Sequence, residues 1–87
     1  MELNIMPNPL NGGESCVFEC RGNYYYADRA FVRDAWCIET MIFAANSNGE
    51  VTDWGDLYCN RSGKSLRECI EEFCSDDYQQ YLQEDLD

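Results

Sequence analysis

Six cysteines offer the widest chemistry in this 87-residue chain, because thiolates bind metals, form disulfides and act as nucleophiles. They are Cys16, Cys20, Cys37, Cys59, Cys69 and Cys74. Nucleophilic catalysis by cysteine needs a neighbouring base, usually histidine, and the chain contains no histidine. The spacings within the pairs Cys16/Cys20 and Cys69/Cys74 also differ from the C-x2-C spacing of zinc sites. We therefore interpret the cysteines as reduced, buried thiols, with disulfide bonds or a small cysteine-ligated metal site as the alternatives.

Two further patterns resemble catalytic motifs. Asp53 and Asp56 flank Trp54, and paired carboxylates can act as general acid and base when they converge on a cleft. Aspartates in loops also cap their own backbone, and we expect that role here. The segment RSGKS at 61–65 resembles the end of a phosphate-binding loop, but Tyr58 stands where that motif requires glycine. The sequence therefore predicts a protein that is not an enzyme, with no catalytic residue, no metal ligand and no cofactor.

Charge is the strongest compositional feature, since 17 acidic residues face six basic ones and the formal net charge is −11. Residues 1–67 contain nine acidic and six basic residues (net −3), whereas residues 68–87 contain eight acidic and no basic residues (net −8). Such a field repels nucleic acids and anionic membranes and attracts basic surfaces. We therefore expect a basic protein surface as partner, with no direct binding of nucleic acid or membrane. An acidic surface that only confers solubility is the alternative.

The acidic C-terminal segment is the predicted partner-binding surface. Its carboxylates recur at steps of about 3–5 residues, which on a helix separates them by roughly 5–7 Å, near the spacing of successive phosphates in a nucleic-acid strand. Like charges four residues apart, such as Glu68 and Glu72, repel each other, and we expect no lysine to relieve them. The predicted partner-binding residues are Glu68, Glu71, Glu72, Asp76, Asp77, Tyr78 and Tyr81, the two tyrosines serving as anchors. A solvated helix face is the alternative.

Residues 35–59 must form the framework that positions this segment, because they hold the longest apolar run, the clearest turn and both tryptophans. The segment 36–45 is largely apolar on both faces, which is typical of a central strand. Asn48-Gly49 predicts a type I′ hairpin turn, in which both residues have positive φ. This register places Phe43 opposite Trp54.

The remaining segments complete one small domain. Pro7 and Pro9 lack amide hydrogens and keep the N-terminal segment extended. Ser65 and Glu68 form a capping box at the start of a helix over 66–74, and a second helical stretch begins at Ser75 or Asp76. Residues 27–34 fit strand, helical turn or loop. The predicted parts are an extended lead-in (1–13), a β-sheet (15–59) and an acidic helical segment (65–86).

These elements predict an α+β fold: a three- to four-stranded antiparallel sheet with a C-terminal helix packed on one face. The hairpin segments Glu39–Phe43, Asn48–Val51 and Leu57–Arg61 resemble small uncharacterised proteins of bacterial phages and mobile elements, in which such a hairpin precedes one helix. That likeness covers residues 36–74 and is structural. In size, acidity and lack of a catalytic apparatus the chain is also similar to anti-CRISPR and antirestriction proteins, which are often DNA mimics that occupy the nucleic-acid site of a host nuclease. The resemblance implies an inhibitor and carries over no functional residue.

Three functions therefore follow as hypotheses. The leading one is a non-enzymatic acidic inhibitor that binds a basic surface of a nucleic-acid-binding host enzyme. The second is a structural or assembly module that self-associates through the strand 36–45, for example as a homodimer. The third is a small cysteine-ligated metal-binding protein. Residues 1–4 lack the features of a signal peptide, and no apolar run approaches the roughly 18 residues that span a membrane, so we expect the cytoplasm of the host cell.

Overall fold

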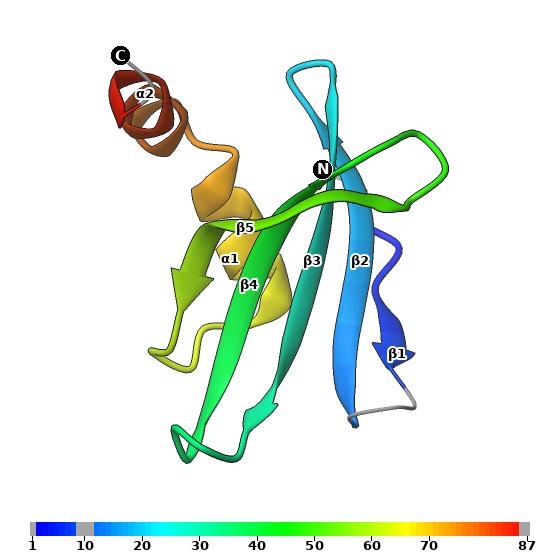
Figure 1. The fold of residues 1–87 in the computed structure, drawn as a ribbon, viewed down its shortest axis with the longest axis vertical. Helices are drawn as coiled ribbons and strands as arrows, with labels where there is room; N and C mark the ends of the chain where they lie inside the picture. Colours follow the sequence, from blue (N-terminus) through cyan, green and yellow to red (C-terminus); the bar gives the residue numbers. More distant parts are fainter. Residues whose placement is uncertain (1, 9–11, 86–87) are drawn as a thin grey trace.

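The computed structural model describes residues 2–8 and 12–85, which form an antiparallel sheet and two helices (Figure 1). In chain order the elements are β1 (Met6–Asn8), β2 (Gly13–Cys20), β3 (Asn23–Val32), β4 (Cys37–Ala45), β5 (Val51–Asn60), α1 (Leu66–Phe73) and α2 (Asp76–Asp85). The strands follow one another in the order β1-β2-β3-β4-β5, and each pairs antiparallel with the next. The predicted α+β fold is confirmed. None of the helices in the described part of the chain is long and apolar enough to cross a membrane.

The number of strands was predicted wrongly, because the sheet has five strands instead of three or four. The additional strand, β1, lies within the expected lead-in and pairs Met6 with Ser15 and Pro7 with Glu14. Pro7 cannot donate a hydrogen bond to the sheet, but β1 is an edge strand, where proline is tolerated. Residues 27–34, whose conformation the sequence left open, continue β3 to Val32 and then turn.

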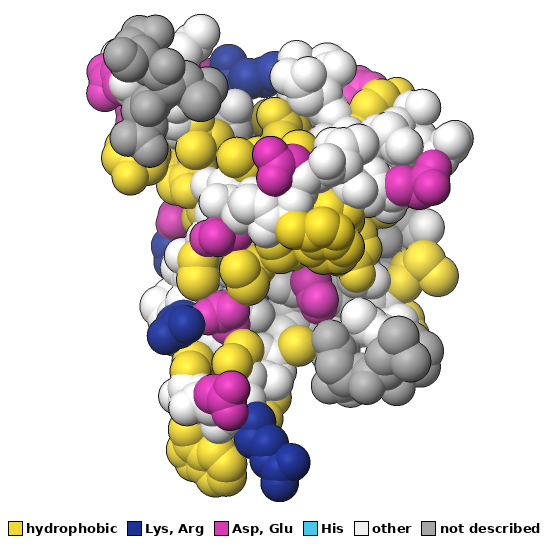
Figure 2. Space-filling model, viewed as in Figure 1, with side chains coloured by type: hydrophobic (Ala, Val, Ile, Leu, Met, Phe, Trp, Pro, Cys, Tyr) yellow, Lys and Arg dark blue, Asp and Glu magenta, His cyan; other side chains and the backbone are white. Residues whose placement is uncertain are grey.

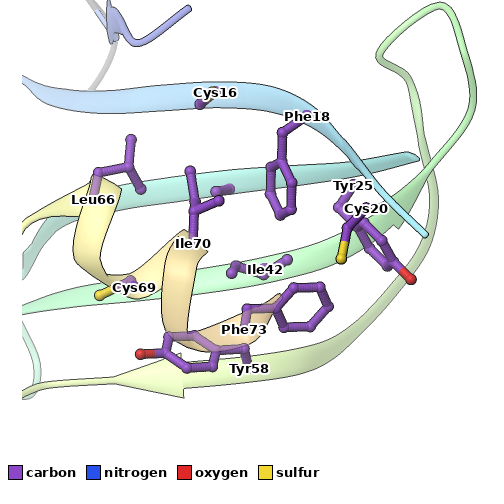
Figure 3. Close-up of a cluster of buried hydrophobic side chains, with 11 residues drawn as sticks. Cys16, Phe18, Cys20, Tyr25, Ile42, Tyr58, Leu66, Cys69, Ile70 and Phe73 are labelled. Carbon is purple, nitrogen blue, oxygen red and sulfur yellow. The ribbon is translucent and has the colours of Figure 1, made fainter. Parts of the chain in front are cut away.

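The core lies between one face of the sheet and α1 (Figures 1 and 3). On β2 the alternation of a pleated strand turns Cys16, Phe18 and Cys20 inward and leaves Val17 and Glu19 exposed. The other buried members are Tyr25, Ala27, Ile42, Tyr58, Leu66, Cys69, Ile70 and Phe73. The core residues that belong to α1 recur every three or four positions, so a single stripe of the helix faces the sheet. They are Leu66, Cys69, Ile70 and Phe73.

Helix α1 begins as predicted. The Ser65 side chain accepts a hydrogen bond from the backbone N–H of Glu68 (3.2 Å), and the Glu68 carboxylate accepts one from the backbone N–H of Ser65 (3.1 Å). This reciprocal capping box satisfies two of the free amides at the helix N-terminus. Leu3 and Ile5 of the N-terminal segment pack against the same core cluster, so the segment before β1 also covers this face of the sheet.

The turn between β4 and β5 differs from the predicted type I′ turn. Only Gly49 has positive φ (83°) in this turn, and the backbone N–H of Asn46 donates to the carbonyl of Glu50 (2.9 Å). The connection is therefore a three-residue loop, 47–49, in which glycine takes the left-handed position. The Asn46 side chain stabilises it by accepting hydrogen bonds from the backbone amides of Asn48 (2.9 Å) and Glu50 (3.0 Å). A side chain that closes the loop in this way removes the need for positive φ at Asn48.

A large bulge in β5 follows this loop. Ala44 pairs with Asp53 and Ile42 pairs with Tyr58, so the four residues 54–57 lie opposite Phe43 alone. The strand bends sharply at this point (Figure 1). The predicted aromatic contact is nevertheless present, with the rings of Phe43 and Trp54 centred 5.1 Å apart.

Candidate partner-binding surface

The acidic residues predicted to bind a partner are divided between two helices. Glu68, Glu71 and Glu72 belong to α1, whereas Asp76 and Asp77 belong to α2. The helices separate at Ser75, whose hydroxyl donates to the carbonyl of Glu72 (2.7 Å) and accepts from the backbone N–H of Tyr78 (3.2 Å). Ser75 thereby caps α2, as predicted, and α2 turns away from the direction of α1 (Figure 1). The expected row of carboxylates along one rigid helix is therefore broken into two short groups.

Three of the five carboxylates have partners within the chain. Glu68 belongs to the capping box, and its hydrogen bonds with Ser65 lower the pKa of its carboxyl group. Asp76 forms an ion pair with Arg21, at the turn between β2 and β3. Glu72 forms an ion pair with Lys64 and accepts a hydrogen bond from the Tyr58 hydroxyl (3.0 Å).

These contacts of Glu72 correct an expectation from the sequence. The hydrogen bond from Lys64, followed by that from Tyr58, lowers the pKa of the Glu72 carboxyl group, so this group is ionised and compensated. Lys64 lies eight residues before Glu72, outside the helix, but the loop before α1 brings its ammonium group to the carboxylate. The repulsion between Glu68 and Glu72 is thus relieved by a lysine, contrary to the prediction.

Three of the predicted residues present free surface. Glu71 and Asp77 are exposed and make no ion pair within the described part of the chain. Tyr81 is 57% exposed on the outer side of α2. The carboxylates of Glu71 and Asp77 are thus outside the ion pairs of the described residues, while Tyr81 contacts the ring of Tyr78 and keeps most of its own surface exposed.

Tyr78 has a different role from the one predicted, because it is half-buried and joins α2 to the sheet. Its hydroxyl donates to the backbone carbonyl of Leu57 (2.5 Å). Its ring contacts those of Phe73, Tyr58 and Tyr81, with centroids 5.6, 5.3 and 5.7 Å away. Tyr78 therefore fixes the position of α2 and also supports the ring of Tyr81.

A groove of about 410 Å³ runs between β5 and α2. Tyr78 and Tyr81 line it together with Leu82 and with four residues of β5 that were not predicted to bind a partner, which are Asp56, Leu57, Tyr58 and Cys59. Sequence spacing could not find these residues, because the bulge opposite Phe43 shifts the register of β5 and decides which of its side chains face α2. Two of the predicted partner-binding residues, Tyr78 and Tyr81, therefore face this bulged strand across the groove.

The opposite face of the sheet carries a smaller hollow. Figure 2 shows this face, with hydrophobic side chains gathered around the bend of β5 and acidic side chains between them. The hollow has a volume of about 150 Å³ and lies beside the exposed Trp54, with Met41 and Phe43 in its lining. Because β4 is hydrogen-bonded to β3 on one side and β5 on the other, self-association through the strand 36–45 cannot use strand pairing and is limited to these outward side chains.

Asp53 and the cysteines, which were considered as catalytic or metal-binding residues, have the following surroundings in the structure. Asp53 lies in β5 at the start of the bulge, where its carboxylate accepts a hydrogen bond from the backbone N–H of Gly55 (2.9 Å). Cys16, Cys20 and Cys69 are buried, as expected, whereas Cys59 is exposed. Across residues 2–8 and 12–85, no group of three or more cysteine, aspartate or glutamate side chains is placed to hold a metal ion.

The fold and this surface define a small acidic α+β protein with an open five-stranded sheet that is covered on one face. No protein-family model, curated protein or solved structure matches the chain.

Proposed function

We propose that this protein is a non-enzymatic inhibitor that binds a basic, nucleic-acid-binding surface of a host defence nuclease, in the manner of anti-CRISPR and antirestriction proteins. The distribution of charge carries this proposal. The net charge is −11, and at least four of the six basic side chains form ion pairs with acidic side chains within the described part of the chain. The cations that would neutralise the remaining acidic surface must therefore come from elsewhere.

A basic protein surface is the partner best suited to this field. Nucleic acids and anionic membranes are repelled, whereas a groove built to hold phosphates presents many lysine and arginine side chains. The field would steer the two proteins together, and both the rate and the strength of association would fall as salt screens the charges. The cytoplasm of the host cell, where such nucleases act, is the proposed location.

The exposed residues Glu71, Asp77 and Tyr81 are proposed to contact the partner directly. Glu68, Glu72 and Asp76 would contribute to the field while they hold the two helices in place. Mimicry of the phosphate spacing of a DNA strand is not needed for this proposal, since complementarity between an acidic surface and a basic one suffices.

The test measures cleavage of plasmid DNA by a panel of purified RNA-guided nucleases and restriction endonucleases, with and without this protein. We expect inhibition of at least one enzyme, and weaker inhibition at high salt. The double variant Glu71→Lys/Asp77→Lys should weaken that inhibition by about tenfold or more, because it replaces two attractive contacts with repulsive ones.

The matched control is the double variant Glu2→Lys/Asp34→Lys. Both of its sites are exposed and lie outside the helices, and the formal net charge changes by the same amount. This control should inhibit within about twofold of the unmodified protein, because only the local field at the helices differs. The proposal is overturned if no enzyme of the panel is inhibited, or if the two double variants behave alike.

A further inference from the structure

The groove between β5 and α2 has a composition that selects one kind of side chain. Its walls are aromatic, because the rings of Tyr58, Tyr78 and Tyr81 form a continuous series with successive centroids 5.3 and 5.7 Å apart. Tyr58 is 3% exposed and forms the floor, while Tyr81 is 57% exposed and forms the outer wall. The hydroxyls of Tyr58 and Tyr78 already donate to Glu72 and Leu57, so these two residues present mainly their ring faces.

One carboxylate lines the groove beside these rings. Asp56 is exposed and lines the groove directly. Glu72 of α1 does not line the groove, but it accepts a hydrogen bond from the hydroxyl of Tyr58 and is paired with Lys64. Burial raises the pKa of Tyr78, and its interactions with Tyr81, Glu72 and Asp56 raise it further. No basic side chain is among the residues that line the groove.

We propose that this groove binds the side chain of an arginine on the basic partner. The planar guanidinium group would stack on the ring of Tyr81, and its N–H groups would donate to the carboxylate of Asp56. This inference rests on the proposed function for the nature of the partner, and it assigns the site at which that partner is anchored.

Arginine fits these features better than the other candidates. Its guanidinium is weakly hydrated and stacks on aromatic rings, whereas the lysine ammonium is a compact, strongly hydrated charge. A purely apolar side chain would leave the Asp56 carboxylate without a counter-charge, and a nucleotide base would bring phosphates into a region of net −8. The volume of about 410 Å³ is within the range of roughly 300–1,000 Å³ that is usual for ligand sites.

The test uses the intact protein labelled with ¹⁵N and three small probes, one of which, N-acetyllysine methylamide, carries a compact ammonium charge. N-acetylarginine methylamide carries the guanidinium, and N-acetylcitrulline methylamide has nearly the same shape without the charge. We expect the arginine probe, with a dissociation constant on the order of millimolar, to shift the amide resonances of β5 residues 56–59 and of α2. The citrulline probe should produce no comparable shift.

Two variants and a control locate the binding. Asp56→Asn removes the charge and keeps the volume, and we expect it to weaken arginine binding by about fivefold or more. Tyr81→Ala removes an exposed ring that the fold does not need, and the shifts should be lost. Trp36→Ala removes an aromatic ring that is 76% exposed in the turn between β3 and β4, and it should leave binding unchanged.

Equal shifts with arginine and citrulline, equal affinity for N-acetyllysine methylamide, or no shift at all in residues 56–59 and α2 would overturn the assignment of an arginine site. The two proposals fail separately. If the arginine probe binds in the groove and no nuclease is inhibited, the proposed function falls and the site stands. If a nuclease is inhibited and the arginine probe does not bind in the groove, only the proposed arginine site is refuted.

Discussion

Replacing Phe73 by alanine should cause the largest loss of stability of any single truncation in the core. Phe73 is fully buried (0% exposed) at the end of α1. Its ring contacts four other aromatic rings, those of Phe18, Tyr25, Tyr58 and Tyr78, with centroids 4.8–6.2 Å away. It is thus the side chain through which the sheet, α1 and α2 pack together.

The expected cost follows from burial and from the lost ring contacts. A buried phenylalanine changed to alanine typically costs about 3–5 kcal/mol, and the four aromatic contacts place Phe73 at the upper end of that range. A domain of 87 residues is stable by about 4–13 kcal/mol. The substitution therefore removes a third or more of the stability of the fold.

The assay is urea unfolding followed by circular dichroism. With a slope of about 1–1.5 kcal/mol per molar urea, the midpoint should fall by about 3–5 M. The matched control is Phe31→Ala, which makes the same chemical change at a side chain that is 52% exposed and contacts only the ring of Trp36 among aromatic rings of the described chain. That variant should lose about 1 kcal/mol or less. If the two variants lose the same stability, the packing role assigned to Phe73 is wrong.

Three further predictions concern a hydrogen bond, a helix cap and an exposed thiol. Tyr58→Phe removes the hydrogen bond to Glu72 and should cost about 1–2 kcal/mol in urea unfolding at neutral pH. Because the contact lowers the folded-state pKa of Glu72, its contribution is present above the ordinary glutamate pKa and is lost as pH falls through the lowered value. The cost of the substitution should therefore decrease as the pH of the unfolding experiment is lowered, and a cost that does not change with pH would contradict this. Ser65→Ala removes the cap of α1 and should cost about 1 kcal/mol in the same assay. Ser47→Ala in the exposed loop should change stability by less than about 0.5 kcal/mol, and equal effects of the two substitutions would contradict the capping role of Ser65. Cys59 should be alkylated first by N-ethylmaleimide under native conditions, as measured by peptide mass spectrometry, because it is the exposed cysteine. Burial raises the pKa of its thiol, so it should react more slowly than a free thiol, and modification of a buried cysteine before Cys59 would contradict this order.

Local patterns allowed several features to be predicted. The capping box depends on residues three positions apart, so the start of α1 at Leu66 was readable from Ser65 and Glu68. The contact between Phe43 and Trp54 followed from the position of the turn between them. The α+β fold followed from alternating apolar residues before position 60 and helical spacing after it.

Features that depend on distant contacts were missed or predicted wrongly. Pro7 predicted only an extended N-terminal segment, and pairing with β2 turned part of it into β1 at the edge of the sheet. The Asn46 side chain closes the loop before β5, so the Asn-Gly pair did not need the predicted type I′ geometry. The ion pair between Lys64 and Glu72 was missed because the packing of α1 on the sheet sets the path of the loop that contains Lys64.

The sequence by itself determined the acidity of this protein, its division into a strand-rich part and a helical part, and the position of the first helix, because composition, alternation and capping act over a few residues. Only the tertiary structure decided which carboxylates remain available for a partner. Asp76 meets Arg21 across 55 positions of the chain, and Glu72 meets Tyr58 across 14. Such pairs form only when the sheet brings distant segments together, and the same packing creates the groove between β5 and α2.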